Sequence, residues 1–268
     1  MILLEPEDFH KAIEQLDKVD YNCYFAKSVL QKHVMGNVYV DNVKNPTVFY
    51  IVHPYGMSLL LGDYTNTLFI NNFQNYCLNT DYKRKHVDWL QVFPIEWCDV
   101  IEKIGNSTEK IIESYKRINF KFNPDIYQSV RKTIDLDAYH LEETNATVFE
   151  SMPGTVVPLY FWDNATDFVT NSKSFSLFVD GQPVSTAFAS FLIDDILEIG
   201  IQTADGYQRN GYSALTSCRL IDYCIEKGLE PLWSCKNDNV GSIKLAYKLG
   251  FEVARTGPYY KINCYEMQ

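Results

Sequence analysis

The sequence predicts an α/β (α+β) protein in which helices flank a mixed β-sheet. Two kinds of pattern in the C-terminal half predict it: short runs rich in β-branched and aromatic residues, and longer runs with apolar residues at helical spacing. The third observation is their order, which is hairpin, strand, glycine-containing loop, helix, strand, helix. Segments in this order form helices packed on a sheet that has both parallel and antiparallel neighbours.

The first three strands of this half are separated by clear turn signals. An Asp-Gly pair at 180–181 separates 174–179 from 183–192 and favours a tight hairpin turn. An Asp-Asp pair at 194–195 precedes the third strand, 196–203, in which residues of the two faces alternate. These segments therefore predict a hairpin followed by a third strand.

Two helices follow the third strand. An apolar stripe that includes Cys218 and Ile221 predicts the first, and Gly228 ends it. A short strand over 232–235 comes next. Asn239 then offers an N-cap for the last helix.

The N-terminal half predicts a helix-rich domain with a small sheet. Helical patterns come first, and three short strand-like runs follow, at 38–40, 47–53 and 58–63. Over 87–127 the pattern is mostly helical, until Pro124 interrupts it. We place a boundary there, which gives an N-terminal accessory domain, 1–130, and a C-terminal domain, 131–268.

Charge and composition argue against two kinds of partner. Lys and Arg number 24 against 34 Asp and Glu, so the net charge is −10. A chain this acidic repels phosphate backbones, and we expect no nucleic-acid partner. No apolar run is long enough to span a bilayer, and no basic segment precedes the apolar N-terminal residues, so we expect neither a membrane partner nor a secretory signal.

The cysteines and histidines indicate a cellular location and argue against some kinds of metal and catalytic site. The 7 cysteines are odd in number and form no CxxC pair, so we expect reduced thiols in a cytoplasmic protein, most of them in the core. Because HExxH and CxxC spacings do not occur, we expect no metal site. No histidine follows His140, which excludes a Ser-His-Asp or Cys-His arrangement confined to the second half.

The loop YQRNGYS, 207–213, is a candidate anion site between the third strand and the next helix. The N–H groups at a helix start point outward, and the helix dipole adds partial positive charge. Gly211 lets a phosphate approach the backbone, and Arg209 can add a charged contact. An ordinary strand-to-helix turn explains the loop equally well, and the loop alone does not decide between the two.

Two motifs resemble the GNAT superfamily of N-acetyltransferases. Gln208, Gly211 and Ser213 fit its acyl-CoA loop, Q/R-x-x-G-x-G/A, with serine in place of the final glycine or alanine. The segment NVGSIKLAYKLGF, 239–251, is similar to the family's last motif, NxxAxxLYxKxGF. The segment PLWSCKN, 231–237, resembles one subfamily in particular, the one that includes the zwittermicin A resistance acetyltransferase.

The resemblance implies an acetyl-CoA-dependent N-acetyltransferase in which an amine attacks the thioester directly, without an acyl-enzyme. It implies a GNAT-like C-terminal domain with splayed central strands that hold acetyl-CoA, the cosubstrate, and an N-terminal domain that is a separate accessory domain or a degenerate half of the same architecture. The residues then implied to bind acetyl-CoA are Ile201 and Thr203 along the strand, Gln208, Arg209, Asn210, Gly211, Tyr212, Ser213 and Ala214 around the pyrophosphate, and Asn239 and Ser242 at the distal pantetheine.

Acetyl transfer to an amine needs a base, because most amines are protonated at pH 7. Glu198 is the candidate, on the strand before the loop; a solvated strand carboxylate is the alternative. The family's usual general acid, a tyrosine, falls at Ala246, and Tyr247 lies one position later, about 100° further round a helix. Tyr247 is therefore either the acid or an exposed packing residue, and the leaving thiolate can also take its proton from water.

The acceptor implied by the resemblance is a small-molecule amine, and the charge of −10 favours a cationic one such as an aminopolyol. Two other functions stay open: acetylation of a protein or peptide amine, and a non-catalytic acyl-CoA-binding or regulatory module, which Ala246 favours. Trp162 and Trp233 are candidates for lining an acceptor pocket, although the mid-strand position of Trp233 favours the core. The sequence leaves the oligomeric state open, a homodimer included.

Overall fold

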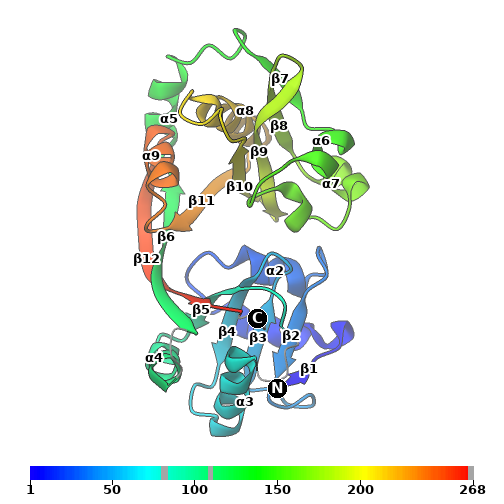
Figure 1. Cartoon of the computed structure of the whole chain (residues 1–268), viewed down its shortest axis with the longest axis vertical. Coiled ribbons are helices and arrows are strands. Elements are labelled where there is room, and N and C mark those ends of the chain that lie inside the picture. Colours follow the sequence, from blue (N-terminus) through cyan, green and yellow to red (C-terminus); the bar gives the residue numbers. More distant parts are fainter. Residues whose placement is uncertain (80–83, 108–110, 265–268) are drawn as a thin grey trace. The chain divides into compact units, whose positions relative to one another are not determined.

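The computed structural model describes residues 1–79, 84–107 and 111–264, and the chain divides into two compact units (Figure 1). Unit 1 holds Met1–Arg117 and the C-terminal segment from Thr256, and unit 2 holds Ile118–Arg255. Both divisions fall inside long strands, β6 (Ile112–Phe122) and β12 (Phe251–Ile262).

This division differs from the expected boundary at residue 130. The helix α5 (Pro124–Arg131) belongs to unit 2, where Tyr127 is buried and its hydroxyl donates to the Cys218 carbonyl (2.9 Å). The last residues of β12 instead belong to unit 1 and pair antiparallel with β5 (Asp88–Phe93). A local interruption by proline therefore does not mark the division, because tertiary contacts assign the flanking segments.

Unit 1 contains a sheet with the order β1-β2-β3-β4-β5-β12. Its further elements, in chain order, are β1 (Ile2–Leu3), a 3-10 turn (Pro6–Asp8), α1 (His10–Leu16), α2 (Tyr24–Leu30), β2 (Asn37–Val40), β3 (Val48–Val52), β4 (Met57–Gly62), α3 (Thr67–Leu78) and α4 (Trp97–Ser107). The pairs β1–β2, β2–β3 and β3–β4 are antiparallel, whereas β4 and β5 run parallel. The three strand-like runs expected in this half are confirmed as β2, β3 and β4.

The expected helical stretch over 87–127 is wrong for much of its length, because β5 and β6 lie within it. β5 has buried residues on both faces, two of them the polar Asp88 and Gln91, so it shows no alternation of apolar and polar residues. The end of β6 does alternate, since Ile118, Phe120 and Phe122 are separated by polar residues, and the helical interpretation overlooked this signal. The sheet of this half is consequently larger than the sequence patterns indicate.

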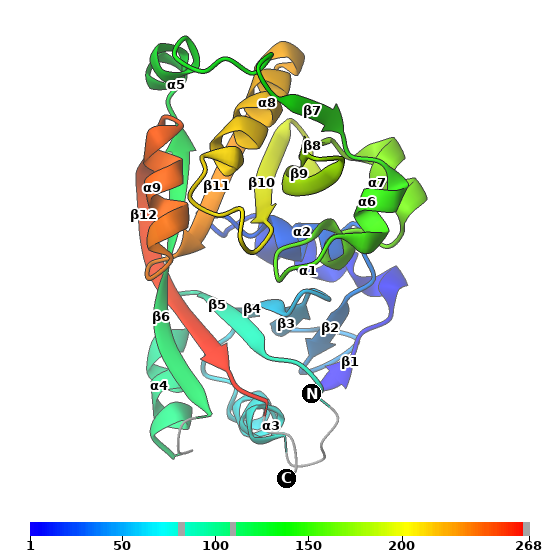
Figure 2. The same cartoon turned by 45° about the horizontal axis from the view of Figure 1, so that its top comes forward.

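Unit 2 contains a sheet with the order β6-β11-β10-β9-β8-β7. Its further elements are β7 (His140–Glu143), α6 (Ala146–Ser151), a 3-10 turn (Pro158–Tyr160), α7 (Ala165–Asn171), β8 (Ser174–Val179), β9 (Gln182–Ile193), β10 (Ile196–Thr203), α8 (Tyr212–Lys227), β11 (Glu230–Lys236) and α9 (Val240–Lys248). The helix α8 packs along β8, β9 and β10 (Figure 2). The expected hairpin, third strand and two helices are confirmed as β8–β9, β10, α8 and α9.

The chain repeats one order of elements, once from β1 to β6 and again from β7 to β12. Each copy runs strand, helices, three antiparallel strands, helix, parallel strand, helix and long strand. The two copies can therefore be compared element by element: α3 corresponds to α8, and the pair β4–β5 corresponds to β10–β11.

The copies differ at this parallel pair of strands. In unit 1, Met57–Leu61 of β4 pair with Trp89–Phe93 of β5, to the end of β5. In unit 2, the described residues of β10 and β11 pair only over Ile196–Glu198 and Glu230–Leu232, although both strands continue beyond them. The expected splay of the central strands is thus a feature of unit 2.

Candidate active site

One edge of β10 pairs with β9, and the other faces the space that β11 leaves. Near the end of this pairing, the Ala204 N–H donates to the Val184 carbonyl (2.9 Å). Because the backbone groups of successive residues alternate between the two edges, those of Ile201 and Thr203 point away from β9. The Thr203 carbonyl also accepts from the Gln202 side chain (3.2 Å). Ile201 and Thr203, both expected to bind pantetheine, therefore lie on the edge from which β11 has separated.

The helix α8, which follows β10 in the chain, begins without a side-chain cap. Its N-cap is Gly211, with φ +83°, a conformation that favours glycine. In contrast, α3, α5, α6, α7 and α9 each begin with an asparagine whose side chain accepts a backbone N–H. The first N–H groups of a helix generally have no partner within it, although that of Ala214 donates to the Gly211 carbonyl (2.9 Å). The first turn of α8 contains no acidic residue. The start of α8 is therefore suited to an anion.

The loop before α8 is braced by two of its own side chains. Gln208 donates to the Asp205 carboxylate (3.2 Å), and Asn210 donates to the Tyr207 carbonyl (3.2 Å). Arg209 is exposed and adopts a left-handed φ of +66°. Left-handed residues occur in the concave backbone nests that bind anions. The loop thus presents its backbone, with the side chains of Gln208 and Asn210 holding its shape.

Glu198 is buried, with 5% of its surface exposed, and it is hydrogen-bonded to the second central strand. The Ser234 hydroxyl of β11 donates to Glu198 Oε1 (2.6 Å). Leu197, Ile199 and Trp233, which flank these residues, all belong to the core of unit 2. Glu198 and Ser234 therefore lie on the opposite face of the sheet. A burial of this degree does not fit the alternative of a solvated carboxylate.

Sequence reasoning missed Ser234. The signal was available, since Ser234 lies between Trp233 and Cys235 in a strand whose successive side chains alternate. Two large or sulfur-containing neighbours that face the core place the serine on the other side, where Glu198 lies.

The segment between α6 and α7 is hydrogen-bonded to β9 and β10. Gln202, four residues after Glu198 on β10, accepts from the Val156 N–H (3.3 Å). In the same segment, Trp162 donates its indole N–H to the Ala189 carbonyl of β9 (2.8 Å). Trp162 is thus fixed against β9, whereas Trp233 is 2% exposed and lies in the core, as its position in the strand favours.

The sequence and fold of this chain are similar to those of known proteins. A family model described as GNAT acetyltransferase matches residues 18–260. The chain belongs to the GNAT acetyltransferase family. It is therefore an acetyltransferase, and GNAT acetyltransferases use acetyl-CoA.

Similar proteins match nearly the whole chain. The uncharacterized N-acetyltransferase YdfB of Bacillus subtilis is 26% identical over 239 residues, which cover 85% of this chain and 86% of that protein. A GCN5-related N-acetyltransferase-like protein from Streptococcus suis has a TM-score of 0.74 at 19% identity and covers 96% of this chain and 99% of its own. A tandem GNAT protein from the clavulanic acid biosynthesis pathway has a TM-score of 0.59 at 9% identity, with 97% of each chain covered. These two solved structures show that the fold is shared.

The tyrosine position of the last GNAT motif is filled by Ala246, which is fully buried. Tyr247 is 52% exposed, and its ring packs edge-on against Phe120, with centroids 5.9 Å apart. This contact agrees with the packing alternative for Tyr247 and leaves its hydroxyl on the exposed side of α9.

Asn239 and Ser242 form the start of α9. Asn239 caps the helix, because its side-chain oxygen accepts from the Ser242 N–H (3.1 Å). The Ser242 hydroxyl accepts from the indole N–H of Trp233 (3.0 Å). The GNAT resemblance assigns both side chains to pantetheine binding. In the structure the Asn239 side chain caps α9, and the Ser242 side chain fastens the helix to β11.

Several other chemical groups are structural. Burial raises the pKa of the Cys218 thiol to about 11 and that of Cys224 to about 12, so both stay protonated near neutral pH in the core. Burial lowers the pKa of His53 to about 3, which leaves this core histidine neutral. Among the residues that the structure describes, no group of three or more His, Cys, Asp or Glu could hold a metal ion. Within the same residues, no helix is long and apolar enough to cross a membrane.

Proposed function

We propose that this GNAT protein transfers the acetyl group of acetyl-CoA to an amine of a small molecule, and that unit 2 is the catalytic half. One observation carries the proposal: β11 leaves β10 directly after Glu198, next in sequence to a helix whose start has no side-chain cap. A separated strand edge binds amide groups as an added strand would, and an uncapped helix start binds phosphate. Acetyl-CoA carries both kinds of group.

In this proposal acetyl-CoA is bound mainly by backbone groups. The pantetheine amides pair with Ile201 and Thr203 along the open edge of β10. The pyrophosphate accepts from the N–H groups of the loop and of the first turn of α8, and Arg209 adds a charged contact. Asn239 and Ser242 contact the distal pantetheine. The residues that receive the pyrophosphate are Gln208, Arg209, Asn210, Gly211, Tyr212, Ser213 and Ala214.

Glu198 is proposed as the general base. The acceptor amine loses a proton to Glu198, directly or through one water, and its nitrogen attacks the thioester carbonyl carbon. The C–S bond of the tetrahedral adduct then breaks, and coenzyme A leaves as a thiolate that takes its proton from Tyr247 or from water. Ser234 holds one carboxylate oxygen of Glu198 at 2.6 Å and so fixes the direction of the other.

The acceptor is proposed to be a cationic small molecule, such as an aminopolyol of the kind that the resemblance to the zwittermicin A resistance subfamily implies. The net charge of −10 attracts such a molecule at long range. The burial of Glu198 supports a small acceptor over a peptide, because a protein amine needs an open groove. Cytoplasmic location and a homodimer belong to this proposal as expectations.

We also propose that unit 1 is a degenerate copy of the same architecture, without an acyl-CoA site. It has the same order of elements, but β4 and β5 stay paired and Asn66 caps α3 through its own side chain. In unit 1, β5 pairs with the edge of β4, and the Asn66 side chain accepts from an N–H at the start of α3. In the proposed site of unit 2, acetyl-CoA bonds to the corresponding strand edge and helix start.

A second function is favoured by one observation, the alanine at the usual tyrosine position. Ala246 cannot donate a proton, so unit 2 is alternatively a non-catalytic acyl-CoA-binding module. Mass spectrometry after incubation with acetyl-CoA and an amine library separates the two. We expect at least one amine of the library to gain an acetyl group, with free coenzyme A released in equal amount. Tight binding of acetyl-CoA without any acetylated product supports the module instead.

A further inference from the structure

Unit 1 contains a polar cavity of about 370 Å³ between α3 and the strands β2 and β3. Pockets for small molecules usually have volumes of about 300–1,000 Å³. Four asparagine side chains line this cavity: Asn37 on β2 and Asn72, Asn75 and Asn79 on α3 or at its end. The Asn79 carboxamide is already hydrogen-bonded to the backbone of Arg84, and Asn72 donates to the Leu68 carbonyl. The carboxamides of Asn37 and Asn75 can offer N–H donors and a carbonyl acceptor, so this wall suits a hydrophilic ligand rather than an apolar one.

Aromatic rings form a second, rigid part of the wall. Tyr39 and Tyr76 line the cavity, and their ring centroids lie 6.0 Å apart. Tyr39 stacks on Tyr50 at 6.2 Å, and Tyr50 packs edge-on against Phe73 at 5.0 Å. Rings that are already held by their neighbours lose little freedom when a ligand binds, which favours binding.

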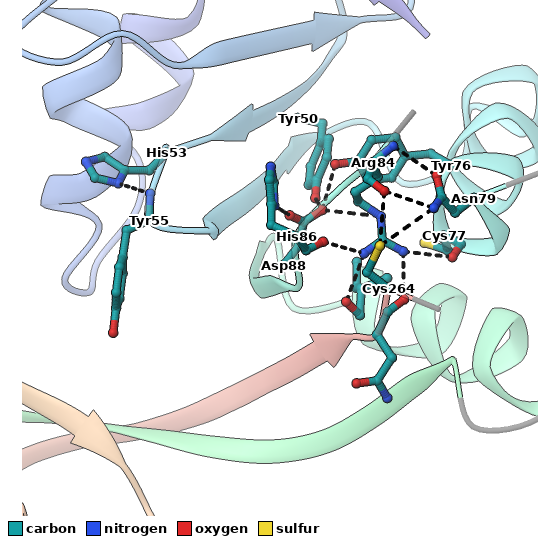
Figure 3. Close-up of polar contacts among 12 residues, drawn as sticks. Tyr50, His53, Tyr55, Tyr76, Cys77, Asn79, Arg84, His86, Asp88 and Cys264 are labelled. Atoms are coloured by element: carbon teal, nitrogen blue, oxygen red, sulfur yellow. Dashed lines mark hydrogen bonds and ion pairs between the residues drawn. The ribbon is translucent and has the colours of Figure 1, made fainter. Parts of the chain in front are cut away.

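A buried carboxylate, that of Asp88, contacts two of the residues that line the cavity, Tyr76 and His86 (Figure 3). Asp88 is 0% exposed, and its Oδ2 accepts from the hydroxyls of Tyr50 (2.8 Å) and Tyr76 (2.6 Å). Its Oδ1 lies 3.0 Å from Nδ1 of His86. Asp88 thus fixes the positions of Tyr76 and His86, and Nε2 of His86 is the ring nitrogen that Asp88 does not contact.

The guanidinium of Arg84 is hydrogen-bonded to the protein itself and fixes the segments around Asp88. Its guanidinium donates to four backbone carbonyls, those of Cys77, His86, Ile262 and Asn263. Its Nε lies 4.0 Å from Asp88 Oδ2, so the buried guanidinium and carboxylate offset each other.

Besides Arg84, the cavity wall holds two groups that can carry positive charge, the imidazole of His86 and the α-amino group of Met1. The hydrogen bond to Asp88 raises the pKa of His86, which favours the imidazolium. The side chain of His86 is 47% exposed, and none of the described residues that line the cavity is an aspartate or glutamate. In a chain with a net charge of −10, this is a local site of positive charge.

We propose that this cavity binds a small hydrophilic anion, a carboxylate or phosphate ester that also carries several hydroxyl groups, such as a sugar acid or sugar phosphate. The anionic group pairs with His86, the hydroxyl groups bond to the asparagines, and the carbon face of the ligand packs on Tyr39. A volume of about 370 Å³ is too small for coenzyme A, so this site is not a second acetyl-CoA site. The proposal does not depend on the proposed acetyl transfer.

Isothermal titration calorimetry tests the site with three probes, glucose 6-phosphate, glucuronate and uncharged glucose. We expect saturable binding of one or both anions and weaker binding of glucose. Preference for glucose 6-phosphate identifies a phosphate ester, and preference for glucuronate identifies a carboxylate.

Matched variants assign the binding to this cavity. Asn75→Leu places an apolar group in the cavity wall, whereas Asn71→Leu makes the same change on the same helix at an exposed residue outside the wall. We expect Asn75→Leu and His86→Gln to weaken anion binding about tenfold or more, and Asn71→Leu to leave it unchanged. Thermal melts of each variant confirm that it is folded.

Three results overturn the proposal. They are no saturable binding of either anion to the wild-type protein, glucose that binds as tightly as the anions, and equal loss of binding in Asn71→Leu and Asn75→Leu. Acetyl-CoA binding is measured in the same samples, so a failure here is distinguishable from a failure of the proposed acetyltransferase site.

Discussion

The two parallel strand pairs of this chain, β4–β5 and β10–β11, occupy the same place in a repeated order of elements but differ in how far they pair. In the described residues, β4 and β5 pair to the end of β5, whereas β10 and β11 separate after Glu198. The following helix differs too, since Asn66 caps α3 with its side chain and Gly211 leaves α8 without such a cap. Under the proposed function, this difference explains why only unit 2 binds acyl-CoA: it alone combines an opened strand pair with an uncapped helix at these positions.

The strand sequences account for part of this difference. Met57–Leu61 of β4 are all buried, and burial on both faces favours a fully paired parallel strand. β10 instead carries the carboxylate of Glu198 at its centre and ends in three partly exposed residues, 201–203. Continuous pairing is therefore less strongly favoured in β10 than in β4.

The largest effect is expected from Glu198→Gln in unit 2. Glutamine keeps the size and a hydrogen bond to Ser234 but cannot accept the amine proton, so acetyl transfer should fall about 10²–10⁴-fold. Acetyl-CoA affinity should stay nearly unchanged. Steady-state kinetics and calorimetry measure the two quantities. Glu230→Gln, an exposed glutamate at the start of β11, is the matched control, and equal loss of activity in both variants contradicts the assignment of the base.

The next effect concerns the helix start. Gly211→Val forces a β-branched residue into φ +83° and places its side chain where the phosphate is expected, so acetyl-CoA affinity should fall about tenfold or more. Gly181→Val in the β8–β9 turn is the control, because Gly181 also has a positive φ (+75°) and open space around it. Calorimetry with acetyl-CoA should separate the two variants. Normal affinity in Gly211→Val contradicts the loop assignment.

A smaller effect is expected from Ser234→Ala, which removes a hydrogen bond to Glu198. The bond holds the carboxylate in one orientation, so its loss should lower kcat about tenfold at most and leave acetyl-CoA affinity unchanged. Steady-state kinetics and calorimetry measure the two quantities. Ser234→Thr keeps the hydroxyl and should restore kcat. An unchanged kcat in Ser234→Ala means that the serine does not orient the base.

The smallest effect is expected in unit 1, at the side-chain cap of α3. Asn66→Ala removes the cap of α3 and should lower the free energy of unfolding by about 1 kcal/mol. Acetyl-CoA affinity should not change, because the corresponding strands stay paired. Chemical denaturation and calorimetry measure both. A weakened acetyl-CoA complex would mean that unit 1 takes part in binding it.

Much of unit 2 could be predicted from the sequence, because its turns carry strong local signals. The Asp-Gly pair at 180–181, the glycine that ends α8 and the asparagine that caps α9 each fix an element boundary in the structure. Gly211 and Glu198 became candidates through the resemblance to the GNAT loop motif and the strand before it, and they stay predictions.

The rest depended on contacts that no local pattern records. β5 is buried on both faces, so its period was not visible, and the division of the chain falls inside β6 and β12 rather than at Pro124. The cluster around Asp88 joins α3, β3 and the segment before β5. Its members are far apart in sequence, and each alone resembles an ordinary core or surface residue.

Hydrogen–deuterium exchange with and without acetyl-CoA tests the central claim most directly, because it reports on both copies of the repeat in one experiment. We expect acetyl-CoA to slow exchange in 199–215, over the open edge of β10 and the start of α8, and to leave the corresponding segment of unit 1, 57–70, unchanged. Unchanged exchange in 199–215, or protection of 57–70 instead, contradicts the account.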